Sequence, residues 1–175
     1  QDNAATHDPF DWLEGLAYHY DAAGVSDQAA DYAEAAGDKA LATMAIDRAR
    51  AHYLTALRAL DALPQLTPVL KLRWCAIAQK LGQTCVFDPL DVHEGFVMFE
   101  RAAQLARETG DQNALARTEY WLGYVHYGRG RPRDAVRHCE AALTHALTCG
   151  DAKLVAQVEA TLGQSLASAG RYDRA

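Results

Sequence analysis

The fold is decided by two stretches that align without a gap at an offset of 40 residues, GDQNALARTEYWLGYVHYGRGRPRDA (110–135) and GDAKLVAQVEATLGQSLASAGRYDRA (150–175). A Gly-Asp pair, a Leu-Gly pair, a Gly-Arg pair and a final alanine recur at matched positions. Self-similarity at a period of about 20 to 50 residues indicates structural units that stack on one another. The chain is therefore expected to be an array of units.

The spacing inside one unit predicts two antiparallel helices. Gly123 lies in the middle of the first helix, where a missing side chain lets a neighbouring helix approach closely. Gly130 ends that helix in a left-handed backbone conformation. Ala135, Cys139 and Ala142 then share one face of the second helix, at intervals of four and three. Such a pair cannot bury its apolar face alone and must pack on neighbouring pairs.

The composition predicts a nearly all-helical protein. The 175 residues include 35 alanines against 12 glycines and 5 prolines, and half of the residues are hydrophobic, which excludes general disorder. Ser26 and Asp111 are predicted N-caps. Caps and breakers together predict helices at 10–23, 26–42, 46–62, 67–83, 91–109, 112–128, 132–149 and 152–169, with a ninth beginning near residue 172.

The net charge and the cysteines indicate which partners and which cellular compartment to expect. Seventeen Lys and Arg against 23 Asp and Glu give a net charge of −6, which would repel nucleic-acid phosphates and anionic lipids. The sequence contains neither an apolar run of about 18 residues nor a basic-then-apolar leader, so no membrane span is expected. Four cysteines without a CxxC pair indicate reduced thiols in a cytoplasm: Cys75, Cys85, Cys139 and Cys149.

Residues Leu122, Gly123, Gly130, Ala135 and Ala142, repeated in part from Leu162 to Ala175, resemble the tetratricopeptide repeat (TPR) signature in a form of about 40 residues. The pattern also opens the chain, from Leu16 to Ala36. Two positions depart from it, because Glu119 stands where the repeat often has Trp and His126 where it often has Tyr. The resemblance implies an all-α fold, a right-handed α-solenoid of about four antiparallel helix pairs.

On this resemblance residues 1–175 form a single TPR-like helical-repeat domain, a fragment of a longer protein. Its parts are N-terminal helices (1–64), an irregular repeat (65–110), one full repeat (111–150) and one truncated repeat (151–175). Stretches 16–24, 35–41, 59–64 and 101–111 resemble the C-terminal helical-repeat half of large bacterial signalling proteins. Those proteins carry an NTPase module, with a class III adenylate or guanylate cyclase domain or a transcription-regulator domain. The resemblance implies that this fragment is the regulatory or scaffolding part.

No catalytic motif is present in the sequence, which lacks GxxxxGK[ST], HExxH, GxSxG and GxGxxG. We therefore predict a non-catalytic chain without a cofactor. His138, Cys139, His145 and Cys149 could present imidazole and thiolate ligands, but the cysteines also suit packing positions, and no metal is predicted. A basic turn could dock an anion or an acidic peptide, or balance an acidic neighbour: Arg129, Arg131, Arg133 and Arg137.

The TPR resemblance also implies a partner-binding groove lined by the first helix of each pair. Tyr120, Tyr124 and Tyr127 are spaced four and three apart and so share one helix face, where tyrosines offer rigid contact area with a polar tip. The alternative is that they pack between helices as core, where Trp74 and Trp121 are expected. The predicted groove residues are Tyr18, Arg117, Tyr120, Tyr124, Tyr127 and Arg131.

The predicted function is that of a cytoplasmic scaffold or regulatory domain that binds a protein or peptide segment, or neighbouring domains of its parent chain. In the groove, Arg117 and Arg131 would take acidic groups of the partner. Two alternatives stay open. The domain could sense a small ligand or peptide and control an attached NTPase or cyclase, or it could be a self-association module.

Overall fold

The structure is a computed structural model that describes residues 11–84 and 92–173. Every regular element in these ranges is an α-helix, as the composition predicts. The eight helices are α1 (Asp11–Ala22), α2 (Ser26–Ala42), α3 (Ile46–Asp61), α4 (Pro68–Thr84), α5 (Val92–Thr109), α6 (Gln112–Gly128), α7 (Pro132–Cys149) and α8 (Ala152–Ser168). All eight predicted spans agree with these within one residue at each end.

The predicted loop around Pro89 lies outside the described residues. Residues 172–173 form a turn, so the ninth helix does not begin at 172, and residues 174–175 are not described. Within the described ranges, no helix has both the length and the apolar character needed to cross a bilayer.

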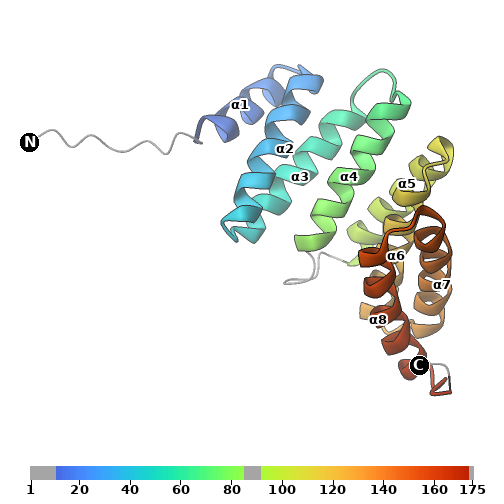
Figure 1. Ribbon diagram of the computed structural model, residues 1–175. Helices are drawn as coiled ribbons and strands as arrows, with labels where there is room; N and C mark the ends of the chain where they lie inside the picture. The colour runs from blue at the N-terminus through green and yellow to red at the C-terminus, as the bar shows by residue number, and fades with distance from the viewer. Residues whose placement is uncertain (1–10, 85–91, 174–175) are drawn as a thin grey trace, which may run out of the picture. The chain divides into compact units, whose positions relative to one another are not determined.

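The chain divides into two compact units, residues 1–67 and 68–175. In the N-terminal unit, α2 packs against both α1 and α3 (Figure 1). Tyr53 of α3 is fully buried there, with its ring over Gly37 and its hydroxyl 2.9 Å from Asp38 Oδ1.

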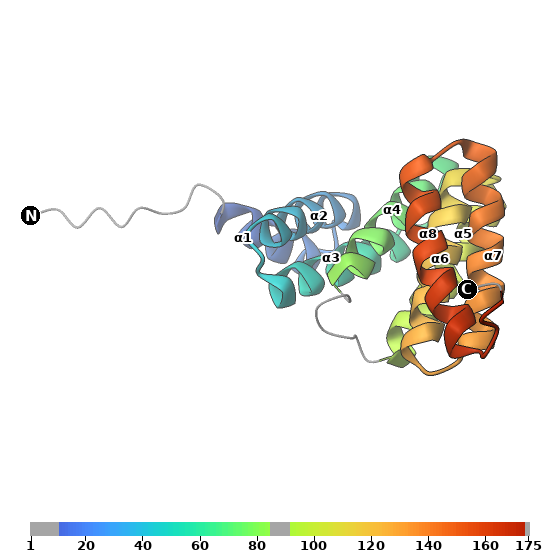
Figure 2. The same ribbon diagram turned by 60° about the horizontal axis from the view of Figure 1, so that its bottom comes forward.

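In the C-terminal unit, neighbouring helices along the chain pack on each other, and α6 also contacts α4 and α8. Helices α6, α7 and α8 lie side by side in both views (Figures 1 and 2). Their shared core consists mainly of small side chains: Ala116, Cys139, Ala142, Ala146, Leu154 and Val158. Trp74 and Trp121 are buried, as predicted.

Two glycines of α4 and α6 allow helices to approach closely. A Cβ built on Gly123 would lie 2.6 Å from Cys139 Sγ, which confirms the close α6–α7 contact predicted from the repeat. A Cβ on Gly82 would lie 2.7 Å from the ring of Trp121. Both contacts are closer than a methyl group tolerates, so the backbones approach closely only because these side chains are absent.

Helix α6 ends as the repeat predicts. Gly130 has a φ of +68°, the left-handed region, and its N–H donates to Tyr127 O while the Arg131 N–H donates to His126 O. This pair of bonds is a Schellman motif, which satisfies carbonyls that the helix end leaves unpaired. The same pairing closes α7 around Gly150.

Only one of the two predicted N-caps is found. The Asp111 carboxylate accepts a hydrogen bond from Ala114 N at 2.7 Å, and Asp151 caps α8 in the same way through Leu154 N. The prediction for Ser26 is wrong, because Val25 occupies the cap position of α2 and supplies no side-chain bond. In each case the cap is the residue that directly follows a left-handed glycine, and Ser26 stands one position too late.

Candidate functional site

The three tyrosines predicted to line a groove lie on α6 and are each half-buried. Tyr120 packs partly against the α6–α8 core, and burial raises the pKa of its hydroxyl. Tyr124 and Tyr127 follow along the same helix. We call Tyr120, Tyr124 and Tyr127 the tyrosine row. Because each side chain is half-buried, part of it packs against the protein and part of it is accessible to solvent.

Trp121 backs the tyrosine row. Its ring lies 5.3 Å from the ring of Tyr120 and 5.6 Å from that of Tyr124, edge-on in both cases. The tryptophan ring also stacks on Phe99 at 5.8 Å, with the two planes 9° apart, and lies against Gly82. Offset stacking and edge-on contacts are the favoured arrangements of aromatic rings. Two of the three rings in the row, Tyr120 and Tyr124, are thus held against a buried aromatic pair.

Arg117 is engaged within the protein. Its Nη2 lies 2.5 Å from Asp151 Oδ2, and its Nε donates to Asn113 Oδ1 at 2.8 Å. Asp151 is the N-cap of α8, and the hydrogen bond from Leu154 N and the Arg117 guanidinium lower the pKa of this carboxyl. Arg117 therefore links α6 to the start of α8, a role that the groove prediction did not include.

The other two predicted groove residues are both exposed. Arg131 precedes α7 in the C-terminal unit. Tyr18 is 71% exposed and belongs to the N-terminal unit, where its ring contacts His19 at 5.6 Å. The structure thus brings five of the six predicted residues into one unit, on α6 and the turn that follows it.

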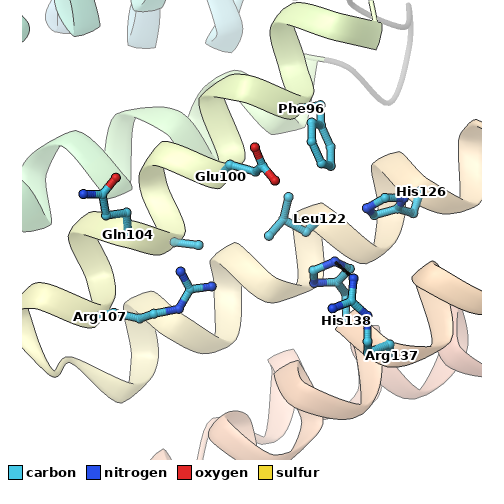
Figure 3. Close-up of a pocket in the computed structure, with 9 residues that line it drawn as sticks. Phe96, Glu100, Gln104, Arg107, Leu122, His126, Arg137 and His138 are labelled. Atoms are coloured by element: carbon cyan, nitrogen blue, oxygen red, sulfur yellow. Dashed lines mark hydrogen bonds between the residues drawn. The ribbon is translucent and has the colours of Figure 1, made fainter.

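A second feature, which the sequence analysis did not find, is a pocket of about 500 Å³ where α5, α6 and α7 meet. Side chains of α5 and α7 face each other across Leu122 of α6 (Figure 3). Phe96 and Leu122 supply apolar surface, and part of the lining is ionisable: Glu100, Arg107, His126, Arg137 and His138. We call this the α5–α7 pocket.

A chain of polar contacts runs beside the α5–α7 pocket. Arg107 Nη2 donates to Glu119 Oε1 at 3.2 Å, and Glu119 Oε2 lies 2.7 Å from His138 Nδ1. His138 Nε2 lies 3.2 Å from Arg137 Nη2. Because an ionised carboxylate can only accept, Nδ1 of His138 donates the hydrogen bond to Glu119.

Glu119 is buried within this chain of contacts, with its side chain 10% exposed. Burial alone would raise the pKa of the carboxyl, but the hydrogen bond from His138 and the charge of Arg107 outweigh it, and the pKa is lowered. Glu119 is therefore ionised at neutral pH and holds the two side chains that flank it.

His126 completes the polar lining of the α5–α7 pocket. Its ring stacks on His138 at 5.0 Å with planes 10° apart, and Phe96 meets it edge-on at 5.2 Å. The side chain is 5% exposed, and its Nδ1 has no hydrogen-bond partner among the described residues; Asp134 Oδ2 is 3.9 Å away. Burial and the neighbouring His138 lower the pKa of His126, so a neutral ring with an unpaired nitrogen lines the pocket.

The four residues considered as metal ligands have other roles in the structure. His138 pairs with Glu119, and His145 with Gln112. Cys139 is buried beneath Gly123, and the thiol of Cys149 donates to Ala146 O at 3.4 Å. Burial raises the pKa of the Cys139 thiol to about 12. Among the residues that the structure describes, no cluster of three His, Cys, Asp or Glu side chains could hold a metal ion.

The four arginines of the basic turn predicted from the sequence have different surroundings in the structure. Arg137 lines the α5–α7 pocket, and the Arg129 guanidinium lies 5.6 Å from the ring centroid of Phe96. Arg131 and Arg133 are exposed. A signal for the pocket was present in the sequence, because Glu119 and His126 are the two departures from the repeat pattern, and they lie seven residues apart on one helix face.

Comparison with known proteins leaves the family open: no protein-family model matches this chain, and no curated protein matches it either.

Proposed function

We propose that the C-terminal unit is a non-catalytic recognition module that binds a protein segment across the tyrosine row of α6. The observation that carries this proposal is the packing of Tyr120 and Tyr124 against Trp121, which fixes two aromatic rings while leaving part of each accessible. Rigid, amphipathic rings give contact area at a low entropic cost, and tyrosine is enriched among the residues that dominate binding energy.

The surroundings of the row suit an extended or helical segment with acidic groups. Arg131 is exposed at the end of α6, beyond Tyr127. Arg117, by contrast, already pairs with Asp151, so the proposal gives the contact with acidic groups to Arg131 alone. The proposed site therefore contains fewer residues than the groove expected from the sequence.

In the wider proposal, the chain is the TPR-like regulatory or scaffolding part of a larger bacterial signalling protein in the cytoplasm. A catalytic NTPase or cyclase domain would then belong to the rest of that protein. Support for this reading comes from the sequence resemblance together with the close α6–α7 pairing and the left-handed glycines at the repeat positions.

The proposal is tested by selecting a displayed random-peptide library on the intact chain. The selected peptides are then measured against three variants, Tyr124→Ala, Tyr127→Ala and Tyr172→Ala. Tyr172 is 77% exposed and lies outside α6, so it is a matched control for the loss of a tyrosine. We expect binding to weaken in the first two variants and to persist in the third. Peptides that bind all three variants equally would contradict the proposal.

A further inference from the structure

We propose that the α5–α7 pocket is a binding site for a small organic monocarboxylate. This inference is independent of the tyrosine row. On α6 the pocket uses Leu122 and His126, whereas the row uses Tyr120, Tyr124 and Tyr127. At 100° per residue these two sets point in directions more than about 90° apart. Each site can therefore be tested without the other.

Two guanidinium groups supply donors to the pocket. Arg107 contacts Glu119 through Nη2, and Arg137 contacts His138 through Nη2. Each of the two arginines keeps Nε and Nη1 unpaired within the described residues, and their side chains are 60% and 71% exposed. Each unpaired N–H group can donate a charge-assisted hydrogen bond to a carboxylate oxygen.

His126 adds a polar group to the wall of the α5–α7 pocket. Its ring is more than nine-tenths buried, lines the pocket and leaves Nδ1 without a hydrogen-bond partner among the described residues. The ring is therefore a buried polar group in the wall of the pocket, next to the two arginines.

The charges around the pocket favour a monoanion. Arg107, Glu119 and Arg137 together carry one positive charge. Arg129 and Arg131 add positive charge near Phe96 and His126, while Glu100 on the wall and Asp134 near His126 add negative charge. A dianion such as phosphate would be repelled by Glu100 and Glu119, and the net positive charge around the pocket is too small to offset this repulsion.

The apolar part of the lining indicates an organic body on the carboxylate. Phe96 and Leu122 lie near each other in Figure 3, and Ala103 also belongs to the lining. A volume of about 500 Å³ lies within the range of small-molecule sites, roughly 300–1,000 Å³. An aromatic or branched aliphatic acid would place its ring or chain on this surface and its carboxylate toward the guanidinium groups.

The experiment is a titration of the intact ¹⁵N-labelled chain with benzoate, followed by amide and imidazole NMR shifts. Benzamide and benzylamine are matched probes of similar size that carry no charge and a positive charge, and inorganic phosphate tests the dianion. We expect saturable benzoate shifts at Phe96, Leu122 and the His126 ring, with benzamide and benzylamine binding at least about tenfold more weakly.

Variants localise the binding. Arg137→Gln removes an exposed guanidinium at the pocket and is expected to weaken benzoate about tenfold, whereas Arg133→Gln removes an exposed guanidinium elsewhere on α7 and leaves affinity unchanged. Equal binding of benzoate and benzamide would overturn the proposal, as would tighter binding of phosphate or benzylamine. Benzoate affinity that is the same in Arg137→Gln and Arg133→Gln would overturn it as well.

Discussion

The carboxylate of Glu119 on α6 lies 2.7 Å from Nδ1 of His138 on α7. The same carboxylate accepts a hydrogen bond from Arg107 on α5, so one buried side chain joins three helices of the C-terminal unit. Neither Glu119 nor His138 is more than 14% exposed. A polar contact of this kind holds its neighbours in place, but it becomes costly when one partner is removed.

Replacing this carboxylate should destabilise the C-terminal unit. In Glu119→Ala the Nδ1–H of His138 loses its acceptor, and we expect the free energy of unfolding to fall by about 1–3 kcal/mol. Urea denaturation followed by tryptophan fluorescence measures the change. Glu159→Ala, which alters an exposed glutamate of α8, should stay within about 0.5 kcal/mol of the parent chain. Equal losses in the two variants would show that the Glu119 contacts contribute nothing.

Stability should also rise with pH across the titration range of His126. The pKa of this ring is lowered in the folded state from its ordinary value of 6.5, so the unfolded chain binds more protons between the two values. The contribution is fully present above about pH 6.5 and is lost as the pH falls through the folded pKa. NMR titration of the ring should give a pKa below 6.5, and a value at or above 6.5 would contradict the burial described for this side chain.

Glu119 adds a second loss at lower pH. Its pKa is also lowered, from 4.5, so its contribution is present above that value and disappears as the pH falls through the folded pKa. The two losses have the same sign, and the loss from His126 begins at the higher pH. His126→Asn should remove the upper one only, with His19→Asn, an exposed histidine, as the control. Persistence of the upper loss in His126→Asn would assign it to another group.

Filling the space at Gly123 should be destabilising. A methyl group there would meet Cys139 Sγ at 2.6 Å, so Gly123→Ala forces α6 and α7 apart. We expect a loss of about 1–3 kcal/mol by chemical denaturation. Gly15→Ala is the matched control, because nothing lies within 4 Å of a methyl group at that helical position, and it should stabilise by about 0.5–1 kcal/mol. Cys139→Ala should rescue Gly123→Ala, since it removes the clashing sulfur.

The sequence predicts the helices well because their ends are decided locally. Gly130 and Gly150 adopt left-handed conformations that end α6 and α7, and both are visible as repeat positions. The error at Ser26 has a local cause too. The turn geometry assigns the cap to the residue after the left-handed glycine, and at this helix that residue is Val25, which has no side-chain acceptor.

The α5–α7 pocket could not be predicted in the same way. Arg107, Glu119 and His138 lie 12 and 19 residues apart on three helices, and their contact depends on how those helices are rotated about their axes. A small-residue pattern predicts that two helices approach, but it does not fix which polar side chains meet beside the contact. The pairing of Arg117 with Asp151 was missed for the same reason, because it joins two helices across 34 residues.

The tyrosine row gives the last prediction, which concerns binding rather than stability. Tyr124 is half-buried, and its ring packs edge-on against Trp121 without joining the small-residue core of α6, α7 and α8. Tyr124→Ala should therefore leave the helical circular dichroism signal nearly unchanged. It should weaken binding of peptides selected on the parent chain by about 1–3 kcal/mol, the loss expected for an aromatic residue that dominates an interface.

The two readouts for Tyr124→Ala separate a binding role from a structural one. A folded variant with unchanged peptide affinity would remove Tyr124 from the proposed interface. A variant that loses helicity would show that the ring is part of the core, and Tyr124→Phe would then decide, because it keeps the packing against Trp121 and removes only the hydroxyl. If the ring of Tyr124 contacts the peptide, Tyr124→Phe should bind more tightly than Tyr124→Ala. A loss of affinity in Tyr124→Phe relative to the parent chain would show that the hydroxyl also contacts the peptide.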